Sequence, residues 1–164
     1  MNRRPLMLAD NDLNSLIQAL QSSDDNRAAT ALTVLIERPT ADVRLLPHLE
    51  ALLTRHSACV IARPFIFGEL RLLAARALAE ERGAAGILEP VQIEDAAQPL
   101  RTTEIELLGK EAGLKTRGGV AGILDAYNQL NALGKLPRKA VNYDPQVLAR
   151  DAGIRREIRE KRAN

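Results

Sequence analysis

The sequence has very few aromatic residues: tryptophan is absent, and phenylalanine and tyrosine together make up 2% of the 164 residues. The hydrophobic core must therefore be built from aliphatic side chains and alanine, within a hydrophobic fraction of 46%. Leucine and alanine favour helices. Alternating runs typical of strands are nearly absent, apart from a short apolar run at residues 59–61. We therefore predict an all-α fold.

The sequence also lacks a second cysteine and any long hydrophobic run. Cys59 is the only cysteine, which excludes an intramolecular disulfide and is typical of a reducing compartment. No stretch approaches the roughly 20 apolar residues that span a bilayer, and residues 1–12 have no apolar run long enough for a signal peptide. We expect one soluble helical domain, residues 1–164, in the cytoplasm.

Charge is distributed unevenly along the chain. Residues 1–100 contain 10 arginines against 13 acidic residues, a net charge of −3. Residues 101–164 contain 13 basic against 8 acidic residues, a net charge of +5, and all five lysines lie at or beyond Lys110. This asymmetry indicates a basic C-terminal region attached to a near-neutral body.

Residues 67–82 have the clearest helical pattern. Apolar residues recur there at intervals of three and four, which indicates an amphipathic helix with a charged opposite face. The apolar stripe is Leu70, Leu73, Ala74, Ala77 and Leu78, and the charged face is Arg71, Arg76, Glu80, Glu81 and Arg82. Similar patterns and capping residues predict helices at residues 10–21, 27–38, 42–55, 102–112, 120–133 and from 146 onward.

Two segments of the N-terminal half repeat each other. Leu13, Leu16 and Leu20 correspond to Leu46, Leu49 and Leu53 at an offset of 33, and the pattern Ala-Ala-x-Ala-Leu at residues 28–32 returns at 74–78 at an offset of 46. The offsets differ because the second copy carries an insertion between its helices, at residues 56–68. A two-helix unit repeated in tandem is typical of an α-solenoid.

These repeats resemble HEAT-type helical repeats. The residues that carry the resemblance are Leu45, Leu46, Pro47, Leu49, Leu52 and Leu53 in one helix, and Arg71, Ala74, Ala75, Ala77 and Leu78 in the next. The resemblance covers residues 10–83 and implies a short all-α solenoid of HEAT-like hairpins. A connector at residues 84–101 and further helices at 102–164, with a basic tail, would complete the domain.

The insertion at residues 56–68 is the segment with the most distinctive composition. It contains both phenylalanines of the chain, Phe65 and Phe67, beside Arg63. Aromatic residues and arginine dominate protein interface hot spots. The insertion is therefore either a recognition loop or an apolar plug for the end of the solenoid, and the two interpretations can hold in part together. As a recognition surface it would comprise Arg63, Phe65, Phe67, Glu69 and Arg71.

Two further kinds of site have weaker patterns. The basic C-terminal region offers residues that could contact an anion or nucleic-acid phosphates: Arg117, Lys135, Arg138, Lys139, Arg155, Arg156 and Arg159. His56 and Cys59 have the spacing of half a zinc site, but a structural site needs four ligands, and a Cys59 nucleophile would need a positioned base. We expect neither a metal nor a cofactor.

The sequence therefore favours a non-enzymatic protein–protein interaction module, such as a scaffold, an adaptor or a compact bacterial-type toxin-neutralising or regulatory protein. A nucleic-acid-associated helical protein is the first alternative. A small enzyme that uses Cys59 is the second. We expect a protein partner and no membrane.

Overall fold

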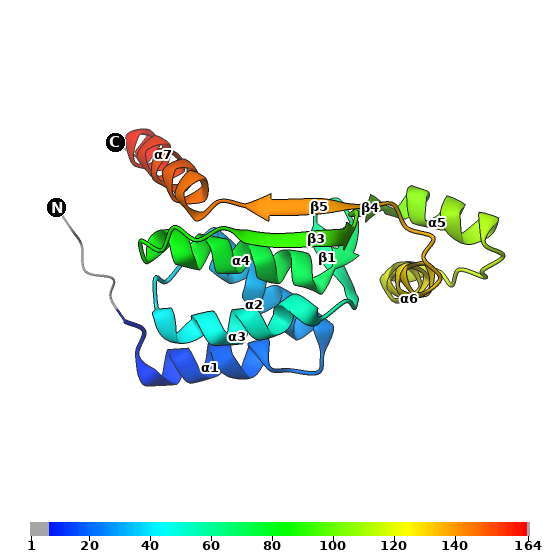
Figure 1. Ribbon diagram of the computed structural model, residues 1–164, viewed down its shortest axis with the longest axis horizontal. Coiled ribbons are helices and arrows are strands. Elements are labelled where there is room, and N and C mark those ends of the chain that lie inside the picture. The colour runs from blue at the N-terminus through cyan, green and yellow to red at the C-terminus, as the bar shows by residue number, and fades with distance from the viewer. Residues whose placement is uncertain (1–6, 164) are drawn as a thin grey trace.

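The computed structural model describes residues 7–163 and shows a mixed α/β fold, so the predicted all-α solenoid of HEAT-like repeats is wrong. About 60% of the chain is helical and 15% is in strands, which form two small antiparallel sheets (Figure 1). Residues 1–6, which belong to the segment expected to lack a signal peptide, lie outside the described residues, as does Asn164. None of the helices described is long and apolar enough to cross a bilayer.

The helices occur close to their predicted positions. They are α1 (Asp10–Leu20), α2 (Asp25–Glu37), α3 (Leu46–Ala51), α4 (Leu70–Ala84), α5 (Thr102–Glu111), α6 (Gly119–Ala132) and α7 (Pro145–Ala163). Short 3₁₀ turns at Val43–Leu45 and Leu52–Thr54 flank α3. The strands are β1 (Ala58–Ala62), β2 (Ile66–Glu69), β3 (Val91–Ala97), β4 (Leu100–Arg101) and β5 (Arg138–Tyr143).

Helix α4 is the centre of the larger core. From Leu70 to Glu81 every residue except Arg76 is buried, because α2 and α3 cover one side of the helix while β3 and α7 lie along the other (Figure 1). The amphipathic pattern predicted an exposed charged face, and this is wrong for three of its residues. Arg71, Glu80 and Glu81 are buried, because elements distant in the sequence cover them.

The insertion at residues 56–68 forms the hairpin β1–β2, and β4 completes a three-stranded antiparallel sheet in the order β1–β2–β4. Val60 pairs with Phe67, which pairs with Leu100. These side chains share the face that packs toward α5 and α6, whereas Cys59 and Ile61 on the other face pack into the helical core. A strand buried on both faces has no alternating pattern, so the short apolar run at residues 59–61 was not enough to predict a strand.

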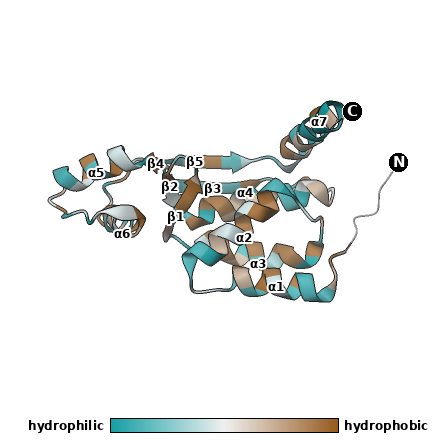
Figure 2. Ribbon diagram, turned by 180° about the vertical axis from the view of Figure 1, so that it is seen from behind, coloured by the Kyte–Doolittle hydropathy of each residue, from teal (hydrophilic) through white to brown (hydrophobic). Residues whose placement is uncertain are grey.

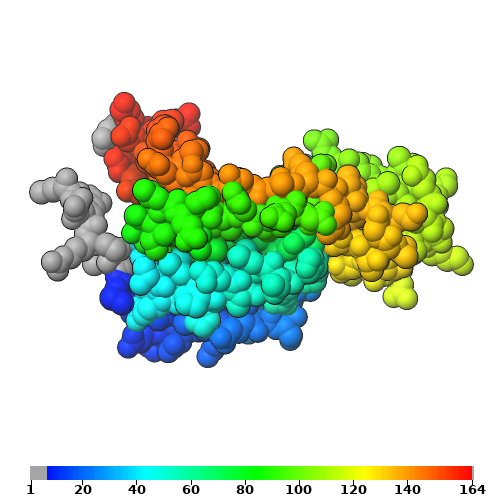
Figure 3. Space-filling view, in the orientation of Figure 1, coloured from blue at the N-terminus to red at the C-terminus, as the bar shows by residue number. Residues whose placement is uncertain are grey.

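The sheet therefore separates two hydrophobic cores. The larger lies among α1–α4, and the smaller lies between the sheet, α5 and α6, in the lobe that projects at one end of the molecule (Figure 3). Hydropathy colouring marks β1 as apolar along its length (Figure 2). The smaller core consists of Ala58, Phe67, Ala97, Leu100, Ile105, Ile123, Ala126, Tyr127, Leu130 and Leu136.

The second sheet joins two segments that lie outside the predicted helices. Strand β3 lies in the predicted connector and pairs antiparallel with β5, with Val91 opposite Tyr143 and Ala97 opposite Arg138. In β3, Val91 and Ile93 are buried and Gln92 is exposed, which is the period of a half-buried strand. This alternation is too short to identify the strand without its distant partner.

Helix α7 packs on α4 where a glycine allows close approach. A Cβ atom added to Gly83 would press against the backbone oxygen of Pro145 and come within 3.2 Å of the Cβ atom of Ala149. Gly153, inside α7, has no such neighbour within 4 Å.

The same substitution at these two glycines should have opposite effects on stability. Alanine in a helix is normally more favourable than glycine by about 0.5–1 kcal/mol, so Gly153→Ala should raise the free energy of unfolding by that amount. Gly83→Ala should lower it, because α7 must move away from α4. Urea denaturation followed by circular dichroism measures both, and a gain in stability at Gly83 would contradict this packing.

Candidate functional site

The two phenylalanines of the insertion have different environments. Phe67, in β2, is 1% exposed and belongs to the smaller core, whereas Phe65, in the turn before β2, is 51% exposed. Their rings stack with centroids 6.3 Å apart and an interplanar angle of 19°. The plug and recognition interpretations thus apply to different residues: Phe67 fills the core, and Phe65 lies at the surface beside it.

A cavity of about 220 Å³ opens beside Phe65, and we call it the Phe65 cavity. Phe65, Phe67, Val120 and Ile123 supply its apolar lining. Phe67 and Ile123 are buried, whereas Phe65 and Val120 are partly exposed. The remaining lining residues come from α5, from the loop before α6 and from the first residue of α6: Thr102, Glu106, Arg117, Gly118 and Gly119.

The Phe65 cavity brings together residues that the sequence assigned to different functions. Phe65 was a candidate for protein binding and Arg117 for anion contact, yet they line one opening. Gly122 makes the local turn possible, because a Cβ atom there would collide with the backbone of Arg117. The contributions of Thr102 and Val120 were missed, since only the fold places α5 and α6 against the hairpin.

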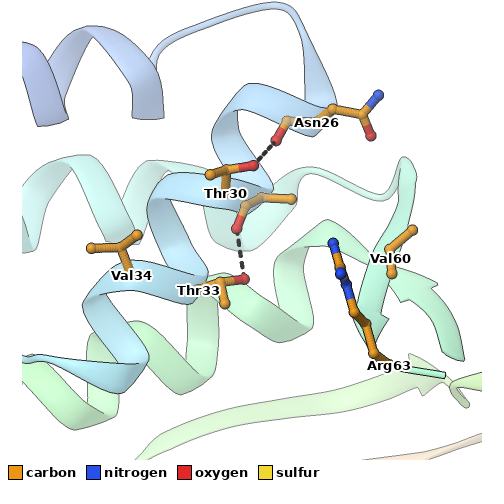
Figure 4. Close-up of a pocket in the computed structure, with 7 residues that line it drawn as sticks. Asn26, Thr30, Thr33, Val34, Val60 and Arg63 are labelled. Atoms are coloured by element: carbon orange, nitrogen blue, oxygen red, sulfur yellow. Dashed lines mark hydrogen bonds between the residues drawn. The ribbon is translucent and has the colours of Figure 1, made fainter. Parts of the chain in front are cut away.

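Arg63 lines a separate groove along α2. Its side chain extends from the end of β1 toward Thr30 and Asn26, and Val60 lies beside it (Figure 4). The groove has a volume of about 300 Å³, and Thr33 and the exposed Val34 also line it. The hairpin therefore presents Arg63 to one cavity and Phe65 to another.

Glu69 and Arg71, also predicted as surface contacts, are buried. The Glu69 side chain is 0% exposed. Its Oε1 accepts hydrogen bonds from Arg71 at 3.0 Å and from the backbone N–H of Ala97 at 2.8 Å. Its Oε2 accepts hydrogen bonds from His56 Nδ1 at 2.9 Å and from the Asn131 side chain at 3.2 Å. Glu69 and Arg71 therefore act inside the fold and are not part of an exposed surface.

The Glu69 carboxylate remains charged despite its burial. Burial alone would raise the pKa of Glu69, but the hydrogen bonds from Arg71, Ala97, Asn131 and His56 outweigh it and hold the pKa below its usual value. Arg71 also donates to the backbone oxygen of Asp95. The polar groups at this junction thus connect α4 with β3 and α6.

The seven predicted basic contacts lie at three places. Arg117 lines the Phe65 cavity, Lys135 lies between α6 and β5, and Arg138 and Lys139 are the first two residues of β5. Arg138 is already engaged, since it donates to Asp95 at 2.9 Å and to Asn131 at 2.6 Å. The others, Arg155, Arg156 and Arg159, lie on α7, at the opposite end of the molecule from α5 and α6 (Figure 1).

Cys59 is buried in the larger core. Burial, together with the charge of Asp25, raises the pKa of its thiol to about 12. A thiol with this pKa stays protonated near neutral pH, and the thiolate is the form that acts as nucleophile and metal ligand. His56 is bound to Glu69, and residues 7–163 contain no group of three or more side chains placed to hold a metal ion.

Comparison of the chain with models of protein families, with curated proteins and with solved structures found no match. A functional proposal therefore depends on the geometry of the chain's own residues. The lining of the Phe65 cavity combines exposed aromatic, aliphatic and charged side chains.

Substitution of each phenylalanine in turn should separate their roles. Phe67→Ala should lower the free energy of unfolding by about 3–5 kcal/mol, because it empties a fully buried site. Phe65→Ala should lower the free energy of unfolding by less than about 1.5 kcal/mol, mainly because the ring stacking is lost. Urea titrations of the two variants measure the difference, and equal losses would show that Phe65 is also a core residue.

Proposed function

We propose that this protein is a non-enzymatic protein-interaction module that holds an apolar side chain of its partner in the Phe65 cavity. The observation that carries the proposal is the half-exposed Phe65 ring, held by stacking on the buried Phe67 at the edge of an apolar opening. Rigid aromatic groups at the surface give large contact area at a low entropic cost.

The size of the Phe65 cavity favours a side chain over a cofactor. Its volume of about 220 Å³ is below the roughly 300–1,000 Å³ typical of small-molecule and cofactor sites. Arg117 and Glu106 add charge of both signs around the opening, which suits a polar rim around an apolar anchor.

The chemistry of Cys59 argues against the alternative of a small enzyme that uses this residue. Its thiol is buried and has a raised pKa, so it is neither accessible nor activated as a nucleophile. A single unpaired cysteine is also typical of a reducing compartment. We accordingly place the proposed function in the cytoplasm.

A peptide selection on the full chain tests the proposal. Peptides selected from a random phage-displayed library on the wild-type protein should share an apolar residue. The Phe65→Ala variant should bind a synthetic peptide of that type about tenfold or more weakly than the wild type does. Leu107→Ala is the matched control, because Leu107 is 60% exposed on α5 but does not line the cavity. Fluorescence anisotropy measures each affinity.

Two results would contradict the proposal. One is a failure to select any peptide. The other is selected peptides that bind Phe65→Ala as tightly as the wild type. A duplex oligonucleotide titrated at several salt concentrations tests the nucleic-acid alternative, since phosphate contacts predict a steep loss of affinity with salt and an apolar anchor does not.

A further inference from the structure

A groove lies between the end of α2 and α7, and we call it the α2–α7 groove. It comprises two overlapping cavities of about 430 and 240 Å³, both lined by Glu37, Arg38, Pro39, Ala152 and Arg159. Arg156 adds to the larger cavity and Arg155 to the smaller. Arginines that are more than a hundred residues apart in the chain therefore line one opening.

Three of these arginines have no carboxylate partner. Within residues 7–163, no carboxylate oxygen lies within 4.0 Å of a guanidinium nitrogen of Arg38, Arg156 or Arg159. Glu37 and Glu160 line the larger cavity but do not reach them. Arg155 is 4.0 Å from the buried Glu80. The groove thus offers three guanidinium groups with their donors free.

We propose that the α2–α7 groove binds the phosphate group of a phosphomonoester. Guanidinium groups form paired, charge-assisted hydrogen bonds with phosphate oxygens. A monoester carries a charge of about −1.5 to −2 near pH 7 and three terminal oxygens, and the larger cavity presents three arginines against the two carboxylates of Glu37 and Glu160. The larger cavity, at about 430 Å³, is in the range of small-molecule sites, roughly 300–1,000 Å³.

The lining of the groove distinguishes this ligand from nucleic acid. Single-stranded nucleic acids are bound by aromatic side chains on which bases stack, and neither cavity of the groove has an aromatic lining residue. Pro39 and Ala152 instead offer small apolar contacts for a short aliphatic carrier. The site is separate from the Phe65 cavity, because the two cavities share no residue.

Calorimetric titration of the full chain with O-phosphoserine tests the proposal. The wild type should bind O-phosphoserine but not serine at the same ionic strength. The double variant Arg38→Gln, Arg159→Gln should weaken binding of O-phosphoserine by about tenfold or more, since it removes two charge-assisted hydrogen-bond donors from the groove. The control Arg27→Gln, Arg150→Gln removes the same charge from exposed arginines outside the groove and should bind as the wild type does.

Each other outcome overturns the proposal. Equal loss of affinity for O-phosphoserine in both double variants would mean that general electrostatic attraction, and not the groove, holds the ligand. No binding of O-phosphoserine at millimolar concentration would mean that the groove is not a phosphate site. Tighter binding of an oligonucleotide without terminal phosphates, lost in the groove variant, would assign the groove to nucleic acid. Thermal melting of all variants confirms that they are folded.

Discussion

The carboxylate of Glu69 joins the two cores of the molecule. It accepts hydrogen bonds from the segment before β1, from α4, from β3 and from α6, which are four separate parts of the chain. A buried charge without such partners would be strongly destabilising, so these elements are held in the positions that satisfy it. Loss of one hydrogen-bond donor would leave the buried carboxylate incompletely bonded, and the elements that carry the remaining donors would be held less firmly.

This junction also determines what the surface presents. Because Glu69 ends β2 and Asn131 lies near the end of α6, their hydrogen bond fixes the helix against the hairpin. The start of α6 then lies beside Phe65, and the cavity between them has Val120 and Arg117 on its wall. The proposed interaction site is therefore a consequence of how the smaller core is attached to the helical bundle.

The sequence predicted what depends on local pattern and missed what depends on distant contacts. Helix positions followed from the spacing of apolar residues, since that period is visible within one segment. The sequence could not distinguish Phe65 from Phe67, because Phe67 is buried by contacts with β4, α5 and α6, which are distant in the chain. Glu81 looked exposed but accepts hydrogen bonds from Thr40 and Ala41, and Arg38 could not be grouped with Arg159 before the fold was known.

Native-state hydrogen exchange on Glu69→Gln tests most directly whether this carboxylate holds the two cores together. Glutamine keeps the size of the side chain but replaces a charged acceptor oxygen with a donor. The account predicts that amides in α4, β3 and α6 lose protection together relative to the wild type. Loss of protection confined to the residues next to Glu69, with α6 unchanged, would contradict it.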